Sequence, residues 1–148
     1  MFKRIVHMGL IVNSIDRALP FYRDVFGMRV KADFGLQTGP EVPEIMGLPE
    51  AQVRIVMLEL EGQLVELIEI VQPKREPIHG DTPYGEVGHS HLAFQVDDVD
   101  AAYRYLQERG VEMVIPPQEI PEQKFFYLRD PDNQWVEVVE PLGAFRTS

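Results

Sequence analysis

The chain has no cysteine among its 148 residues. Disulfide bonds, thiolate nucleophiles and thiolate metal ligands are therefore excluded, and a bound metal would need His, Asp and Glu side chains. The sequence also lacks an apolar stretch approaching the roughly 20 residues of a membrane-spanning helix, and its first residues lack the apolar core of a signal peptide. These absences predict a cytoplasmic protein in a reducing compartment, with no membrane partner.

Positive charge is scarce in this chain. Lys and Arg number 14 against 24 Asp and Glu, so the formal net charge is −10 at pH 7. Binding to nucleic acid depends on clustered basic side chains that neutralise phosphates, so the composition predicts no nucleic-acid partner. The length is typical of one domain, and residues 1–148 are expected to form a single domain.

The sequence contains an internal repeat. HMGLIV at 7–12 returns as HLAFQV at 91–96, an offset of 84 (91 − 7). VELIE at 65–69 returns as VEVVE at 136–140, an offset of 71 (136 − 65). The smaller offset means that the first half carries 13 extra residues (84 − 71) between these segments. A repeat of this kind indicates a duplicated structural unit.

Each copy is predicted to fold as a βαβββ module. Module one spans about 1–71, a connector rich in Pro, Gly and charge spans 72–88, and module two spans 89–148. Alternation of apolar and polar residues predicts strands, and apolar residues at helical spacing predict helices. The expected strands are about 4–12, 28–34, 53–60 and 64–71, then 90–97, 111–115, 124–129 and 134–140. The expected helices are about 15–26 and 99–109, and residues 35–50 are expected to form a loop that holds the extra length.

Residues at the helix ends are consistent with these boundaries. Ser14 and Asp98 are candidate N-caps, and Gly110 is a candidate C-terminal stop. Pro20 lies inside the first helix, where it removes a backbone hydrogen bond. We therefore expect a distorted helix at that point.

Two histidines hold matching places in the repeat. His7 shares a strand face with Gly9, and His91 shares one with Ala93, so a small residue leaves space beside each imidazole. The other face of each strand is apolar and suits packing under the helix. His89 also shares the face of His91, but the offset of 84 places it on Ile5, which cannot bind a metal. His89 is accordingly expected at the rim of any site, without a ligand role.

Two glutamates also hold matching places. Glu66 and Glu137 stand among apolar neighbours in the middle of strands, where burial of a carboxylate is costly unless it is paired or metal-bound. Glu69 and Glu140 lie on the opposite face near strand ends and are expected to reach solvent. One His and one Glu per module form a donor set that suits a divalent ion. Structural histidines and an exposed sheet face are the alternative explanation.

Four segments resemble the vicinal oxygen chelate superfamily, which includes glyoxalase I, methylmalonyl-CoA epimerase, extradiol dioxygenases and the fosfomycin and bleomycin resistance proteins. They are HMGLIVNSIDRALPFYRDVFGM, LVELIE, HLAFQVDDVDAAYRYLQERGV and YLRDPDNQWVEVVEP, and together they leave out mainly 35–50 and 72–88. The resemblance implies an α+β fold in which two tandem βαβββ modules form a cupped, incompletely closed mixed sheet around a metal site.

The resemblance also implies a site. The ligand positions of the family fall on His7, Glu66, His91 and Glu137, which would hold one divalent ion per site: Ni, Co, Zn, Mn or Fe. The implied activity is that of a lyase or isomerase that moves a proton next to a carbonyl through a metal-stabilised enediolate. Glu137 is the expected base, with Glu66 as its counterpart on the opposite face.

The implied substrate is a small carbonyl compound or thioester, and the implied assembly is a homodimer with sites built from one chain or across two. The 35–50 loop and the connector are expected to shape the substrate pocket. Two other activities stay open within the same fold. One is non-catalytic binding of a small molecule, as in the resistance branch. The other is extradiol ring cleavage, which a fourth ligand at Glu66 disfavours because fewer metal positions remain for dioxygen.

Overall fold

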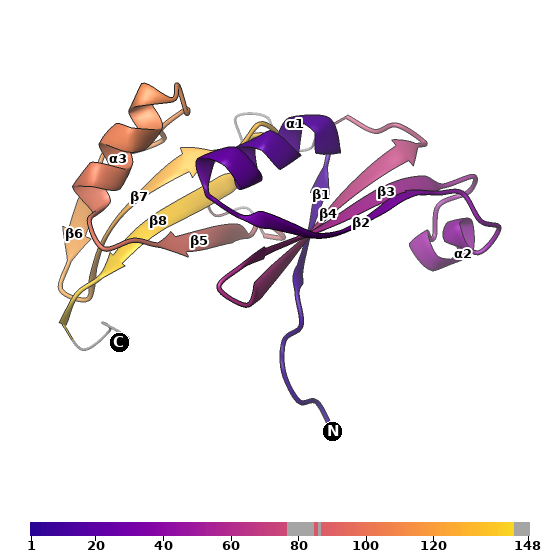
Figure 1. Ribbon diagram of the computed structural model, residues 1–148, viewed down its shortest axis with the longest axis horizontal. Coiled ribbons are helices and arrows are strands. Elements are labelled where there is room, and N and C mark those ends of the chain that lie inside the picture. The colour runs from indigo at the N-terminus through magenta and orange to yellow at the C-terminus, as the bar shows by residue number, and fades with distance from the viewer. Residues whose placement is uncertain (77–84, 86, 144–148) are drawn as a thin grey trace. The chain divides into compact units, whose positions relative to one another are not determined.

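The computed structural model describes residues 1–76, 85 and 87–143 of the chain (Figure 1). The chain divides into two compact units, Met1–Ile78 and His79–Ser148, each with one four-stranded mixed sheet. The expected α+β class with two βαβββ modules is confirmed. The boundary between the units lies within the expected connector at 72–88, most of which falls outside the described residues.

The first unit is built around the sheet order β1-β4-β3-β2. Its strands are β1 (Met8–Val12), β2 (Arg29–Gln37), β3 (Gln52–Leu60) and β4 (Gln63–Gln72). β1 runs parallel to β4, and the other two pairings are antiparallel. The expected strand at 4–12 is shorter than predicted, because β1 begins only at Met8.

The first helix is divided at Pro20. Helix α1 (Ile15–Pro20) is followed directly by a π-helical segment, η1 (Phe21–Val25). Proline has no N–H to donate and its ring clashes with the preceding turn, so the regular α-helical ladder does not continue through it. The distortion expected at this residue is confirmed. Ile15 and Ala18 are fully buried on the side of α1 that contacts β3 and β4.

The second unit repeats the arrangement with the sheet order β5-β8-β7-β6. Its elements are β5 (His91–Gln95), α3 (Val99–Glu108), β6 (Gln118–Ile120), β7 (Gln123–Arg129) and β8 (Trp135–Pro141). β5 is parallel to β8, as β1 is to β4. The core of each unit lies between helix and sheet. It is formed in the second unit by Val99 and Leu106 with Phe126, Leu128, Val136 and Val138.

The strand predicted at 111–115 is wrong. Residues there form a single bridge to β7, and β6 begins later, at Gln118. The N–H groups of Val114 and Ile115 both donate to the carbonyl of Tyr127, at 2.9 and 3.4 Å, which interrupts the ladder. Pro116 and Pro117 follow, and neither has an N–H that could donate the next hydrogen bond of the ladder.

The prediction of a simple loop at 35–50 is also wrong. β2 extends to Gln37, and a short helix, α2 (Val42–Met46), follows and ends at Gly47 in the left-handed conformation (φ 63°). Val42 anchors α2 by packing with the buried residues Ala51 and Val53. The extra length of the first repeat is therefore an ordered insertion against the edge of the sheet.

The helix caps differ between the units. Asp98 caps α3 as expected, because its side chain accepts the N–H of Ala101 at 2.9 Å. Ser14 occupies the N-cap position of α1, but its side chain makes no capping hydrogen bond. Gly110 ends α3 with φ 69°, as predicted. Ser14 therefore occupies the predicted N-cap position without making the predicted capping hydrogen bond.

Glu69 and Glu140 do not serve as solvent-exposed residues, which corrects the expectation for both. Oε2 of Glu69 accepts the first N–H of α1, from Ile15, at 2.9 Å. Oε2 of Glu140 accepts the first N–H of α3, from Val99, at 3.0 Å. A carboxylate at a helix N-terminus satisfies a donor that has no partner within the helix and interacts favourably with the helix dipole. The repeat preserved these two contacts.

No helix in the described part of the chain has the length and hydropathy needed to cross a membrane.

Candidate functional site

In the first unit, His7 and Glu66 form a pair on the sheet face that points away from α1. The parallel register sets Gly9 of β1 opposite Glu66 of β4, and His7 lies just before β1 on the side of Gly9. Nε2 of His7 is 3.5 Å from Oε2 of Glu66, and the two side chains are 39% and 20% exposed. A Cβ at Gly9 would lie 3.9 Å from Oε2 of Glu66. Any side chain larger than alanine would therefore crowd the carboxylate.

In the second unit, His91 and Glu137 form the equivalent pair. The register sets Ala93 of β5 opposite Glu137 of β8. Nε2 of His91 is 3.1 Å from Oε2 of Glu137, and the two side chains are 25% and 11% exposed. His89 is half-buried in the segment before β5 and is not a member of this pair. The structure therefore joins each histidine to the glutamate of its own module.

The carboxylate of Glu137 has a second partner that the sequence analysis missed. Nε2 of Gln123, the first residue of β7, donates to Oε1 of Glu137 at 3.4 Å. β7 pairs with β8 so that Tyr127 lies opposite Glu137. Gln123 is four residues before Tyr127 and so shares its face. The alternation of β7 would have indicated this contact if the predicted strand had begun one residue earlier.

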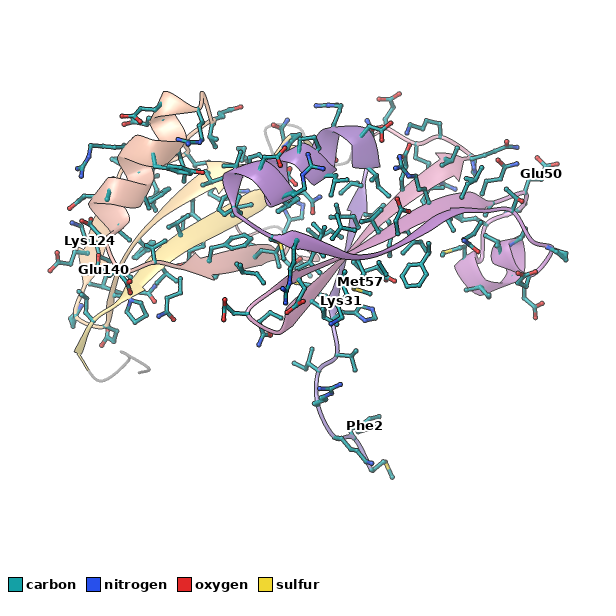
Figure 2. The ribbon with its side chains drawn as sticks, viewed as in Figure 1. Phe2, Lys31, Glu50, Met57, Lys124 and Glu140 are labelled. Atoms are coloured by element: carbon teal, nitrogen blue, oxygen red, sulfur yellow. The ribbon has the colours of Figure 1, made fainter. Side chains whose placement is uncertain are left out.

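An aromatic cluster surrounds His91. The ring centroids of Tyr127 and His91 are 5.6 Å apart, and those of Tyr127 and Trp135 are 5.4 Å apart. Both contacts are edge to face. In the first unit the residue opposite Glu66 is Met57 of β3 (Figure 2). A rigid aromatic ring thus stands beside the second pair, where the first pair has a flexible thioether.

A cavity of about 330 Å³ opens beside Glu66 in the first unit. Its apolar lining comes from β2, α2 and β3 and consists of Phe34, Val42, Ile45, Met46, Val53 and Ile55. Gln37, Glu41 and Glu66 are its polar residues. Glu66 therefore faces both His7 and a hydrophobic space.

The two pairs have the chemistry and the spacing of metal ligands. Imidazole nitrogen and carboxylate oxygen bind zinc at about 2.0–2.2 Å, so neighbouring ligands on one ion lie roughly 3.0–3.5 Å apart. The distances of 3.5 and 3.1 Å within the pairs fall in this range. The residues thus fit a divalent ion. The described residues hold no group of three or more His, Cys, Asp or Glu placed to bind a metal, so each unit by itself offers two ligands.

Comparisons with known proteins identify the superfamily. The sequence profile of the Glyoxalase/Bleomycin resistance protein/Dioxygenase superfamily matches residues 4–138. A lactoylglutathione lyase from Haemophilus influenzae is 30% identical over 144 residues, which cover 93% of this chain and 92% of that protein. Mitochondrial methylmalonyl-CoA epimerase from Mus musculus is 28% identical over 115 residues, 73% of this chain and 54% of that protein.

The fold has been seen in solved structures. A glyoxalase family protein from Bacillus cereus superposes with a TM-score of 0.84 over 97% of each chain, at 23% identity. At that identity the likeness concerns the fold alone. Both His–Glu pairs lie within the segment that the superfamily profile matches.

Proposed function

Because the chain belongs to the glyoxalase/bleomycin resistance protein/dioxygenase superfamily, we propose that it is a divalent-metal-dependent lyase or isomerase that moves a proton next to a carbonyl group. The observation that carries this proposal is the pairing of one imidazole with one carboxylate in each unit, at ligand spacing. The similarity to a lactoylglutathione lyase and to a methylmalonyl-CoA epimerase supports the same class of reaction.

Four side chains would hold the metal ion: His7, Glu66, His91 and Glu137. They supply two neutral nitrogens and two carboxylate oxygens, a donor set that suits Ni, Co, Zn, Mn or Fe. Such an ion, when bound, supplies Lewis-acid stabilisation of negative charge that develops on substrate oxygens. The four ligands belong to one chain or to two chains of a homodimer, and we propose the homodimer as the assembly.

Glu137 is the proposed base, and one of its carboxylate oxygens would accept the proton that leaves the substrate carbon. Its position supports the role, because Gln123 and His91 hold the two oxygens in a defined orientation. Glu66 would act on the opposite face of the substrate, where it borders an open cavity. A general base must lie within hydrogen-bonding reach of the proton it removes, and a fixed carboxylate meets that requirement more often than a mobile one.

The test combines metal analysis with turnover. The purified chain is reconstituted separately with each candidate ion, and the bound metal is measured by mass spectrometry. Turnover is then followed with adducts of 2-oxoaldehydes and thiols, and proton exchange in D₂O is followed with acyl-CoA thioesters. We expect one ion per site and activity that a chelator abolishes. Glu137→Gln should retain the metal and lose turnover, whereas His89→Ala should retain both.

Other outcomes of the same test would redirect the proposal. A chain that takes up no metal in any reconstitution contradicts it. Stoichiometric binding of a small molecule without turnover, unaffected by chelator, would indicate a binding protein of the resistance type. Oxygen consumption with catechols that depends on Fe(II) would indicate a ring-cleaving dioxygenase. Light scattering of the reconstituted protein tests the homodimer.

A further inference from the structure

The cavity beside Glu66 is built by the insertion that separates the two repeats. Four of its lining residues, Glu41, Val42, Ile45 and Met46, belong to α2 or directly precede it. α2 packs on β3 in the first unit (Figure 1). In the second unit β6 and β7 are joined by residues 121 and 122 alone, which leaves no length for such a helix. The first unit therefore carries a feature that the duplication alone does not explain.

The charges of the cavity disfavour an anionic occupant. Its charged lining residues are Glu41 and Glu66, and none of its described lining residues is Lys, Arg or His. In the metal-free chain both carboxylates would repel a phosphate or carboxylate group placed there, and with an ion bound at Glu66 the charge of Glu41 would still do so. Apolar side chains form the rest of the wall apart from Gln37. An uncharged, apolar group is the chemistry that this surface recognises.

The volume sets the size of that group. An apolar cavity of about 150 Å³ holds one benzene molecule. The cavity beside Glu66 measures about 330 Å³, which accommodates a benzene ring together with a short alkyl linker. A whole coenzyme or tripeptide would not fit, so such a moiety would have to lie elsewhere.

We propose that this cavity receives a neutral apolar substituent of the substrate, up to about the size of a phenylalkyl group, and that it selects substrates by that substituent. Glu66 forms one wall of the cavity and belongs to the proposed metal site, so the substituent would sit directly beside the reacting carbon. This inference rests on the proposed function. It adds a specificity pocket that is built by α2, β2 and β3.

Two residues of β2, Phe34 and Leu36, provide a matched pair of substitution sites. Phe34 lines the cavity and is 54% exposed, whereas Leu36 is 53% exposed and does not line it. Leu36 pairs with Arg54, whose side chain donates a hydrogen bond to Asp16 of α1 on the other face of the sheet. A β-bulge between Asp33 and Gly35 makes Phe34 the extra residue and shifts the alternation, so Phe34 and Leu36 lie on opposite faces although they are two positions apart. Phe34→Asp and Leu36→Asp therefore introduce the same charge at equal exposure on opposite faces.

The first experiment uses the metal-free chain and a neutral probe. Benzyl alcohol is titrated into chelator-treated protein, and the methyl signals of Ile45 and Met46 are followed by NMR. We expect saturable shifts of both signals, and none with benzylphosphonate, which adds charge to the same ring. Phe34→Asp should weaken binding at least tenfold, and Leu36→Asp less than twofold. Ile45→Asp, on the exposed side of α2, replaces Phe34→Asp if that variant does not fold.

The second experiment uses metal-loaded protein and alkyl hydroxamates of increasing chain length, which present two oxygens and a variable tail. Burial of each methylene should raise affinity about fourfold until the cavity is filled. Phe34→Asp should flatten this series, whereas Leu36→Asp should leave the gain per methylene unchanged.

The two experiments separate failure of the inference from failure of the proposed function. Absence of benzyl alcohol binding together with a flat hydroxamate series overturns the inference, and metal binding with turnover would still support the proposed function. Absence of metal binding overturns the proposed function, and the metal-free titration still tests the cavity.

Discussion

The two units place the same pair of side chains on the same pair of strands but hold them differently. In the second unit the His91–Glu137 distance is 3.1 Å, and Gln123 holds the other carboxylate oxygen. In the first unit the His7–Glu66 distance is 3.5 Å, both side chains are more exposed, and a cavity opens beside the carboxylate. Duplication thus preserved the donors, while their surroundings diverged.

If the four side chains hold a metal ion as proposed, this difference predicts a division of labour between the units. Ligands that are already fixed lose less conformational entropy when they bind an ion, so the second unit should contribute most of the metal affinity. The first unit has its carboxylate beside an apolar space and should contribute most of the substrate selectivity.

The largest expected effect is on metal affinity. His91→Ala removes a proposed ligand from the more closely held pair and should weaken metal binding more than about 100-fold. This loss would exceed the roughly 10–100-fold typical of a lost outer-shell partner. His7→Ala should weaken it by a smaller factor, because its pair is looser. Competition with a metal-binding dye measures both constants, and His89→Ala is the control that should match the unmodified chain. Equal losses for His7→Ala and His91→Ala would contradict the division.

The next effect concerns Gln123. Gln123→Ala removes the hydrogen bond to Oε1 of Glu137 and should lower metal affinity about tenfold, as expected for an outer-shell partner. Gln118→Ala is the control, because its amide donates to the nearby carbonyls of Pro116 and Pro117. Rescue by Gln123→Asn would indicate a role in positioning. An unchanged metal affinity in Gln123→Ala would show that Glu137 is fixed by its strand alone.

These residues also show what could be read from the sequence. The His and Glu positions were predictable, because the repeat fixes their place on β1, β4, β5 and β8, and strand parity fixes their face. The contact of Gln123 with Glu137 was not predictable, because it depends on the register of β7 with β8 and on the residue at which β7 begins. The repeat has no second copy of α2 either, so self-comparison shows the extra length and not its structure.

The errors in the fold have the same origin. Residues 111–115 have the composition of a strand, but two of their N–H groups share one acceptor and two prolines follow. Glu69 and Glu140 were assigned correctly to the face opposite Glu66, yet their acceptor role requires the helix N-terminus to lie above them. Such contacts arise from packing between distant segments, which local patterns do not contain.

A moderate effect on stability should distinguish the helix caps. Glu69→Ala leaves the first N–H of α1 without its carboxylate, and Ser14 gives no side-chain cap, so we expect a loss of about 1–2 kcal/mol. Glu140→Ala should cost less, about 0.5–1 kcal/mol, because Asp98 still caps α3. Urea unfolding of the two variants measures the difference in the free energy of unfolding. A larger loss of stability for Glu140→Ala would show that the presence or absence of a side-chain N-cap does not determine the size of the effect.

The smallest effect concerns the turns at which the last two strands of each unit meet. In the first unit, Glu59 accepts hydrogen bonds from Arg29 and from the N–H of Gly62, and these bonds, chiefly that from Arg29, lower the pKa of Glu59 below its usual value of 4.5. A carboxyl group whose pKa is lower in the folded chain than in the unfolded chain stabilises the folded state. This contribution is complete at pH values above the pKa of the unfolded chain, and it is lost as the pH falls through the pKa of the folded chain. In the second unit, Oδ1 of Asp130 accepts two backbone N–H groups of the turn, those of Asp132 and Gln134.

Arg29→Gln removes the main cause of that shift. Its free energy of unfolding should be slightly lower than that of the unmodified chain at pH 7. The gap should begin to narrow below about pH 4.5, where Glu59 of the unfolded chain takes up a proton, and should close once the pH has fallen through the lower pKa of folded Glu59. Urea unfolding at several pH values between 7 and 3 measures the gap. A gap that stays constant across this range would mean that Arg29 stabilises the first unit by packing and not through the charge of Glu59.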